Sequence, residues 1–423
     1  MKLVKMSLLA ATLIASSAFA IDNVKVSGDA MLFYGTNDGF DTGFTPSDDA
    51  SLFGKDYSWG QTSLGLGVTA DLTEGVSGGV HLTAISAMGL TNIVSGVFEG
   101  GLTDEFWFDE AWLAGTYGKT TAKIGRMTLD TPLAFTETWS VAYNTFEAGV
   151  LINEDIPDTT VVAAYIGESN NGNAMGIWGT GQYAGITADW DGSQNTNFGL
   201  VNGGKGAYTI GAINNSWAPL TVQGWFYNLP STANAYWVQA DLALDMGLSV
   251  GAQVTGIDAK QVTTGDSSNI AYAAKLGYEM KDTFAVSVAG SQVGTNDNGV
   301  SAGFNVFGAQ TKLYTEAWWN YGYIARPDTT AVNVTVTTPE ELTYVALGVY
   351  ATQAKVGDNG GAVGLYTQDV DMNEVTLEVA KSFGPLDAGL YYIFTDAEDQ
   401  NIKAGDTTGS AYGSFQAYFT YNF

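Results

Sequence analysis

The ten residues SFQAYFTYNF (Ser414–Phe423), with which the chain ends, decide the fold class. Every second residue is apolar or aromatic (Phe415, Ala417, Phe419, Tyr421, Phe423), whereas Ser414, Gln416, Tyr418, Thr420 and Asn422 lie between them. A period of two places these two sets on opposite faces of a β-strand. Something apolar therefore has to cover the first face.

The same alternation recurs along the chain, as at 64–72, 76–84, 236–244, 248–254, 284–288, 375–379 and 388–394. The polar faces are rich in Gly, Ser, Thr and Gln, which suits a wet but crowded interior. Very short connections such as TEG (73–75) and DMG (245–247) alternate with long ones, roughly 35–58, 89–105, 169–205 and 294–312. Short periplasmic turns and longer outer loops are typical of outer-membrane barrels.

These features favour a transmembrane, antiparallel, up-and-down β-barrel over a soluble β-sandwich. A register slip in 236–244 would turn Asp241 and Asp245 towards lipid, at a cost somewhat below the roughly 2–4 kcal/mol of a basic residue at the midplane. The last strand must also pair with the first, for which residues 24–32 are the candidate, because an open edge is not tolerated in lipid. The turn spacing predicts 18 strands, with 16 as the alternative, and a barrel this wide leaves an aqueous channel.

The beginning of the chain predicts export. Lys2 and Lys5 precede a short apolar run and the small residues up to Ala20, the pattern of a cleaved signal peptide over residues 1–20. Residues 21–423 would form a single barrel domain. Removing the two lysines takes the formal net charge from −28 to −30, which repels nucleic acid and favours small cations.

Other chemistry finds little support. The 423 residues include no cysteine and one histidine, His81, which lies on a polar face beside Thr83. A hydrolase would need a nucleophile and an orienting group near that histidine, and no surrounding motif supplies them. We therefore predict no enzyme activity and no cofactor, with structural Ca²⁺ on the acidic loop residues Asp38, Asp41, Asp48 and Asp49 as the one candidate metal.

The most specific region is Phe108–Phe135, FDEAWLAGTYGKTTAKIGRMTLDTPLAF, followed by NTFEA at 144–148. With the aromatic C-terminal strand and the first strand NVKVSGDAMLFYG (23–35), it resembles the Gram-negative outer-membrane porins. The resemblance is greatest to the major outer-membrane porin of Campylobacter and its epsilonproteobacterial relatives. It implies a homotrimeric barrel of 18 strands whose third outer loop, about 128–146 here, folds inward to narrow the pore.

The resemblance further implies that the pore constriction contains Lys123, Arg126, Asp130, Glu137 and Glu147. Arg126 shares its parity with Ile124 and should face lipid, so we expect a bulge at Gly125, or the end of the strand, to turn it into the lumen. The alternative is that Arg126 pairs with a wall carboxylate and only holds the loop. Arg126 and Arg326 are the only arginines, which favours cations over anionic solutes because lining charges set the field of a channel.

The sequence thus predicts a diffusion channel for ions and small hydrophilic solutes in the outer membrane of a Gram-negative bacterium, with a preference for cations. The alternative is a surface barrel that serves mainly in adhesion or anchoring. Expected partners are membrane lipid, lipopolysaccharide, two further copies of the chain, and the barrel-assembly machinery through the C-terminal strand.

Overall fold

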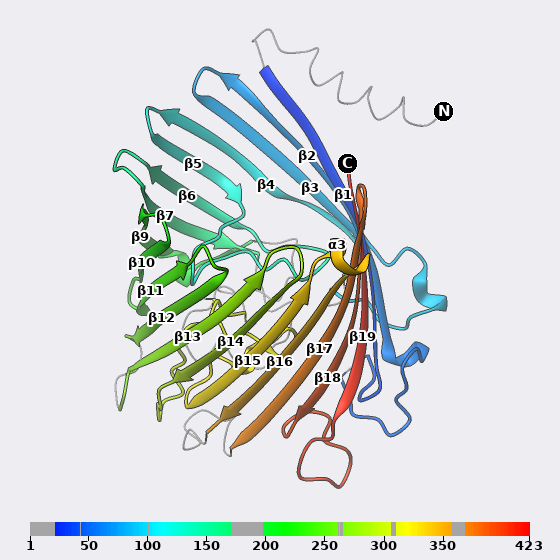
Figure 1. Ribbon diagram of the computed structural model, residues 1–423. Coiled ribbons are helices and arrows are strands. Elements are labelled where there is room, and N and C mark those ends of the chain that lie inside the picture. Colours follow the sequence, from blue (N-terminus) through cyan, green and yellow to red (C-terminus); the bar gives the residue numbers. More distant parts are fainter. Residues whose placement is uncertain are drawn as a thin grey trace, which may run out of the picture.

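The computed structural model describes residues 22–42, 44–99, 102–170, 198–260, 262, 265–305, 310–357 and 369–423. These residues form one antiparallel sheet of 19 strands that closes on itself (Figure 1). One of them, β8 (Gly199–Leu200), is a two-residue piece beside β7, and the other 18 make the barrel wall. The predicted all-β barrel is confirmed, with 18 strands rather than 16. The predicted signal peptide, residues 1–20, lies outside the described residues.

The wall strands follow one another around the barrel in chain order. They are β1 (Asp22–Asn37), β2 (Ser58–Thr73), β3 (Val76–Ser86), β4 (Asp104–Tyr117), β5 (Thr120–Met127), β6 (Phe146–Asn153), β7 (Thr159–Ser169), β9 (Ala207–Trp217), β10 (Leu220–Leu229), β11 (Ala233–Ala243), β12 (Leu248–Ala259), β13 (Ser268–Met280), β14 (Phe284–Val293), β15 (Thr329–Thr338), β16 (Ala346–Val356), β17 (Val370–Phe383), β18 (Leu386–Ala397) and β19 (Tyr412–Asn422).

In the part of the chain that the structure describes, helical structure is confined to connections. The four-residue helix α3 (Glu340–Thr343) lies between β15 and β16. Short 3-10 turns occur at η1 (Lys55–Tyr57), η2 (Leu90–Asn92), η3 (Asn202–Gly204) and η4 (Tyr321–Tyr323). Among the described residues, no helix has the length and apolar character needed to cross a membrane.

The alternation in the sequence becomes the two faces of the wall. On β17, Val375 and Leu377 are exposed, while Glu374 and Thr376, which alternate with them, are buried. On β11, Val238 is 48% exposed and its neighbour Trp237 is fully buried. The outer face is therefore apolar and the inner face carries the polar and packed side chains, as the register argument predicts.

Pairing of the first strand with the last closes the barrel. β1 and β19 run antiparallel, with Met31 opposite Thr420. Beyond the strand pairing, the backbone N–H groups of Gly28 and Phe423 each donate to the other residue's carbonyl oxygen, at 2.8 and 2.9 Å. The terminal strand β19 can therefore be apolar on one face, because its edge is paired with β1 and its outer face is part of the lipid-facing surface.

Short and long connections alternate, as expected. Residues 74–75 and 118–119 make tight turns at the end where β1 begins and β19 ends, and residues 38–57 form a long loop at the other end (Figure 1). One outer connection, 230–232 between β10 and β11, is unexpectedly short. Most of the long connection predicted at 169–205 lies outside the described residues.

Two loops enter the barrel. We name the connection 128–145, between β5 and β6, L3, and the connection 294–328, between β14 and β15, L7. The largest buried cluster combines L3 residues such as Leu133 and L7 residues such as Leu313 and Ile324 with inward-facing wall residues such as Tyr227 and Trp237. The apolar core therefore sits inside the barrel. The sequence predicted the inward fold of L3 but not that of L7.

Candidate functional site: the constricted lumen

L7 is fixed to the inner wall on both sides of the barrel interior. The Tyr314 hydroxyl donates to Oδ1 of Asp241 on β11 at 2.6 Å. On the other side, Glu374 of β17 accepts hydrogen bonds from the backbone N–H groups of Trp319 (3.1 Å) and Asn320 (2.7 Å). A carboxylate that receives several N–H donors holds a loop strongly, because hydrogen bonds to a charged acceptor exceed neutral ones.

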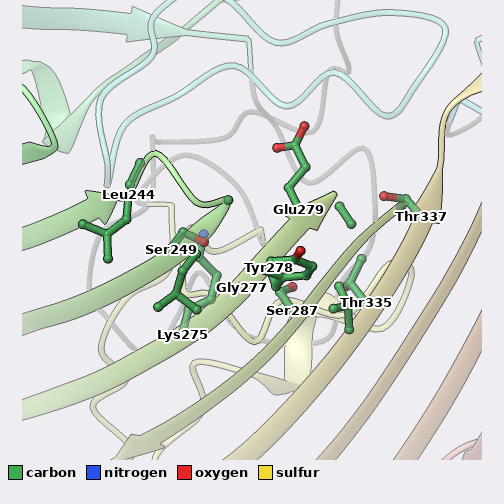
Figure 2. A pocket seen from close by; sticks show the side chains of 14 residues that line it. Leu244, Ser249, Lys275, Gly277, Tyr278, Glu279, Ser287, Thr335 and Thr337 are labelled. Atoms are coloured by element: carbon green, nitrogen blue, oxygen red, sulfur yellow. The ribbon is translucent and has the colours of Figure 1, made fainter. Parts of the chain in front are cut away.

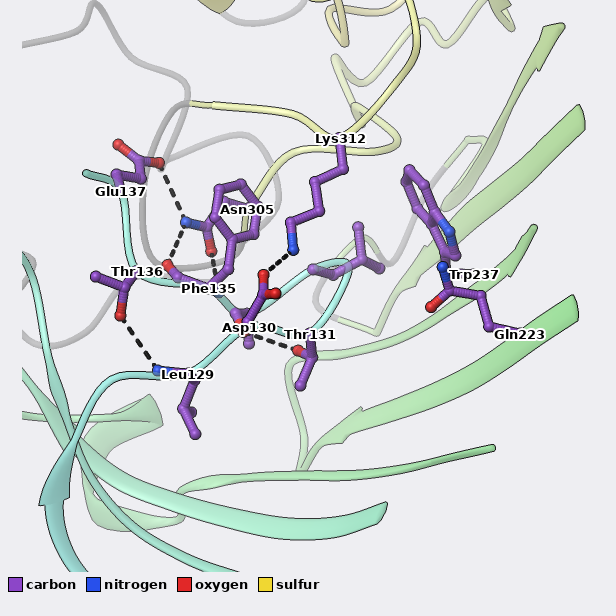
Figure 3. Close-up of polar contacts among 12 residues, drawn as sticks. Leu129, Asp130, Thr131, Phe135, Thr136, Glu137, Gln223, Trp237, Asn305 and Lys312 are labelled. Carbon is purple, nitrogen blue, oxygen red and sulfur yellow. Dashed lines mark hydrogen bonds and ion pairs between the residues drawn. The ribbon is translucent and has the colours of Figure 1, made fainter. Parts of the chain in front are cut away.

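L3 meets L7 in the middle of this interior (Figure 3). Lys312 of L7 forms an ion pair with Asp130 of L3. The Asn305 side chain brackets the backbone of Phe135: its Nδ2 donates to the Phe135 carbonyl at 2.9 Å, and its Oδ1 accepts from the Phe135 N–H at 3.3 Å. The two loops therefore form one connected constriction.

Glu137 is the second predicted site residue at this junction. Its side chain is 7% exposed, and its Oε1 accepts hydrogen bonds from the Gln310 N–H (3.0 Å) and from Asn305 Nδ2 (3.1 Å). Its Oε2 accepts from Trp139 Nε1 at 3.3 Å. Glu137 thus joins L3 to L7, while the exposed Asp130 is the carboxylate that reaches the solvent.

Arg126 does not lie with Asp130 and Glu137 at the junction of L3 and L7. It lies opposite Ala111 on β4 and Glu147 on β6, in regular register, on the face opposite to its buried, core-facing neighbour Met127. Its guanidinium donates to Glu147 Oε1 at 2.6 Å (Nη2) and 3.1 Å (Nε), and to the Phe108 carbonyl at 2.6 Å. The expected turn into the lumen does not occur, and the arrangement corresponds to the alternative in which Arg126 pairs with a wall carboxylate.

The strand pairing at Gly125 explains why Arg126 does not turn into the lumen. Its φ of 124° lies in the region that favours glycine, but the bulge or strand end expected at this residue is absent. The pairing continues through Gly125, opposite Trp112 on one side and Ala148 on the other, without a register shift. Lys123, two residues earlier, faces inward, with its ammonium 4.1 Å from the centre of the Trp112 ring.

A lumenal cluster that the sequence did not predict surrounds His81. Its Nδ1 lies 2.7 Å from Oδ1 of Asp109, its Nε2 lies 3.7 Å from Oδ1 of Asp29, and the Thr83 hydroxyl donates to Asp109 at 3.0 Å. The expected parity of His81 holds. Asp109 reaches the cluster because a register shift between β3 and β4 leaves it as the extra residue of a bulge, which periodicity alone could not reveal.

A depression of about 280 Å³ lies on the inner face where β11 to β15 approach their turns (Figure 2). Hydroxyl groups of Ser249, Ser287, Thr335 and Thr337 line it, together with Lys275. The Lys275 ammonium lies 4.4 Å from the ring centre of Tyr314 in L7, so the depression borders the constriction.

The four candidate calcium ligands make separate contacts in the loop 38–57. Asp38 Oδ1 accepts from the Gly413 N–H at 2.6 Å, Asp41 Oδ1 from the Thr45 N–H at 3.0 Å, and Asp48 pairs with Lys403 at 2.9 Å. Asp49 donates its backbone N–H to Ser47 Oγ at 3.3 Å. Within the described ranges, no group of three or more His, Asp or Glu side chains could hold a metal.

Comparison of the sequence finds no matching family model and no matching curated protein. Comparison of the structure, in contrast, finds similar solved structures. Pseudomonas aeruginosa OpdK, solved with vanillate, is 10% identical and aligns over 95% of this chain and 99% of its own, with a TM-score of 0.69. OccK8 (OprE) and OccK5 (OpdH) of the same bacterium, at 13% and 12% identity, each cover 96% of this chain and 99% of their own, with TM-scores of 0.68 and 0.67.

The chain therefore has the fold of the 18-stranded outer-membrane porins of Gram-negative bacteria. The more particular resemblance to the Campylobacter porin stays a prediction from the sequence.

Proposed function

We propose that this chain forms a water-filled diffusion channel in the outer membrane of a Gram-negative bacterium, for ions and small hydrophilic solutes and with a preference for cations. The observation that supports it most is the constriction itself. Two loops from opposite sides of a closed barrel, L3 and L7, meet inside the wall through Lys312–Asp130 and Asn305–Phe135. A loop-narrowed lumen filters by size, and its lining charges set the selectivity.

The arginines support the cation preference. Arg126 is engaged by Glu147 on the outer face, and Arg326 is 4% exposed, 3.5 Å from Asp399 and stacked on the Tyr323 ring. Neither of the two arginines of the sequence offers a free guanidinium to a permeating anion. A bidentate arginine fork is the side chain best suited to hold a carboxylate.

Carboxylates are also numerous on the inner face. Asp29, Asp109, Glu110, Asp241 and Glu378 lie on inward-facing strand positions, as do the cationic Lys25, Lys123 and Lys275, and Lys312 extends from L7. OpdK was solved with vanillate, an aromatic carboxylate. The acidic excess in this lumen argues that such anions are not its preferred solutes.

We further propose that the protein is exported through the signal peptide of residues 1–20, that β19 is recognised by the barrel-assembly machinery, and that three copies assemble in contact with lipid and lipopolysaccharide. Lys123, Asp130 and Glu137 remain the proposed constriction residues, and Arg126 and Glu147 are proposed to support the base of L3 instead.

The test is reconstitution of the mature protein into a planar bilayer with a KCl gradient. We expect stepwise conductance, closure in threes, and a reversal potential on the cation side. Asp130→Asn should move that potential towards zero, whereas Glu341→Gln, on the exposed helix α3, should not. Absence of conductance from a folded barrel would contradict the channel and favour the surface-binding role. An anion-side potential would contradict the cation preference alone.

A further inference from the structure

The single histidine of the chain lies between two carboxylates on the inner face of the barrel. His81 on β3 has Asp109 of β4 at 2.7 and 2.8 Å from its Nδ1, and Asp29 of β1 at 3.7 Å from its Nε2. The side chains of His81 and Asp29 are 25% and 31% exposed, whereas that of Asp109 is 8% exposed. The cluster is thus partly open to the lumen.

The fold makes room for this arrangement on β2, which runs between β1 and β3. A Cβ atom on Gly65 would lie 2.2 Å from Asp29 Oδ1 and 2.9 Å from His81 Cε1, and one on Gly67 would lie 3.1 Å from His81 Cδ2. Glycine at these two positions leaves the space over β2 in which His81 and Asp29 approach each other, and a larger residue would have to displace their side chains.

The geometry bears on the protonation of the ring. A neutral imidazole has one N–H donor and one acceptor nitrogen, so either tautomer would turn a lone pair towards a carboxylate. Only the imidazolium presents an N–H to each carboxylate, with a hydrogen bond to Asp109 and an ion-pair contact with Asp29 at 3.7 Å. The other ionisable groups facing the cluster are Glu110, opposite His81 in the pairing of β3 and β4, and Tyr143 of L3, which interacts with Asp29.

We propose that His81 is held as an imidazolium and sets the selectivity of the lumen, by cancelling one of the two negative charges of Asp29 and Asp109. This inference rests on the proposed channel function. It makes His81 a specificity-determining residue: the cluster contributes a net charge of about −1 to the lumen, instead of the −2 that a neutral histidine would leave.

The experiment compares reversal potentials in a KCl gradient at pH 7. His81→Gln removes the positive charge, so its reversal potential should shift further towards the potassium equilibrium potential. His81→Lys should restore the wild-type value, because the glycines of β2 leave space for a longer chain. The double variant His81→Gln/Asp109→Asn should also return to it, since Asp29 alone then carries the charge. Thr83→Val, which removes only a neutral hydrogen bond, serves as the control.

A conducting His81→Gln channel with an unchanged potential would overturn the proposal, as would a His81→Lys channel that behaves like His81→Gln. A second measurement does not depend on variants or on conductance. With ¹⁵N-histidine labelling in detergent micelles at pH 7, the one histidine should show both ring nitrogens at imidazolium chemical shifts; the unequal shifts of a neutral tautomer would overturn the proposal. Loss of all conductance in the wild type would instead count against the channel.

Discussion

At the scale of single residues, Arg126 shows how strongly strand register constrains a side chain. Its neighbours Ile124 (68% exposed) and Met127 (1% exposed) mark the outer and inner faces of β5, and Arg126 takes the outer one. The barrel accommodates the charge by pairing it with Glu147 and covering it with the Phe198 ring, 3.7 Å away. The charge is neutralised locally, as an outward-facing guanidinium requires.

Arg126→Leu should lower stability without changing selectivity. Glu147 would lose its partner beside Glu168, at a cost of about 2 kcal/mol for hydrogen bonds to a charged group. The folded form should therefore convert to the unfolded one at a lower temperature in heated gel samples, while the reversal potential stays constant. A shifted potential would mean that Arg126 reaches the lumen after all. Ile124→Leu, on the same face, is the control.

Gly125→Ala should also destabilise the barrel. The φ of 124° is strained for any residue with a side chain, and the new Cβ would lie 2.3 Å from the Ala111 carbonyl oxygen. We expect a loss of about 1–3 kcal/mol from backbone strain, seen as a lower unfolding temperature. Gly115→Ala on β4, where a Cβ meets nothing within 4 Å, should leave that temperature unchanged.

At the scale of elements, the two inward loops differ in how they are secured. L3 is held by its contacts with L7 and by the Leu133 N–H, which donates to the Tyr227 hydroxyl of β10 at 3.2 Å. L7 is bound to β11, β12 and β17: Tyr314 donates to Asp241, Gln253 donates to the Lys312 carbonyl, and Glu374 accepts from the Asn320 N–H. One acidic residue of L7, Glu316, is partly buried, and its backbone carbonyl accepts a hydrogen bond from Asn333 Nδ2 of β15 at 3.4 Å. Burial raises its pKa from 4.5 to about 8, with the Thr311 N–H as an opposing hydrogen-bond donor.

The docking of L7 should therefore weaken as pH rises. Between pH 4.5 and about 8 the docked state keeps a proton on Glu316 that a released loop would lose, so docking is most stable below 4.5 and loses stability up to about 8. Open-channel current noise should grow across this interval and level off above it. Glu316→Gln should give a noise level that no longer changes over the interval; persistence of the change in that variant would assign it to another group.

At the scale of the whole molecule, closure depends on pairing between residues almost 400 positions apart. The β1–β19 register runs from Asp29–Asn422 to Asn37–Ser414. Gly28 leaves room for the Phe423 side chain at the end of this β1–β19 seam, since a Cβ there would lie 2.4 Å from the Phe423 ring. Without this seam two strand edges would be left unpaired in lipid.

A disulfide can test the seam, because the chain has no cysteine of its own. Met31→Cys/Thr420→Cys should cross-link on mild oxidation of the folded protein, since the two positions are direct partners. The cross-linked chain should migrate faster on a denaturing gel, and reduction should reverse this. Thr420→Cys/Ser291→Cys, with the second cysteine on β14, should not cross-link. Equal cross-linking of both pairs would contradict the register.

Much of this architecture could be predicted because strand periodicity is a local property. The faces of 236–244 and 375–379 and the tight turns at Gly75 and Gly118 followed from short stretches of sequence, whereas the inward fold of L3 was implied by the resemblance to the porins. The inward fold of L7 could not be predicted, because its contacts join Glu137 to Gln310 and Asn320 to Glu374 over 173 and 54 positions. The cluster at His81 required a bulge at Asp109, which alternation does not encode.

The sequence by itself determined the barrel, its strand number within two, and which side chains face lipid, since each strand must present an apolar face to the membrane regardless of its neighbours. Only the tertiary structure decided how the charges are used. Arg126 forms an ion pair with Glu147 outside the lumen, and His81 lies between Asp29 and Asp109 inside it. The physical reason is that an ion pair forms only when its charged atoms come within about 4 Å, and those distances are set only once distant strands are brought side by side.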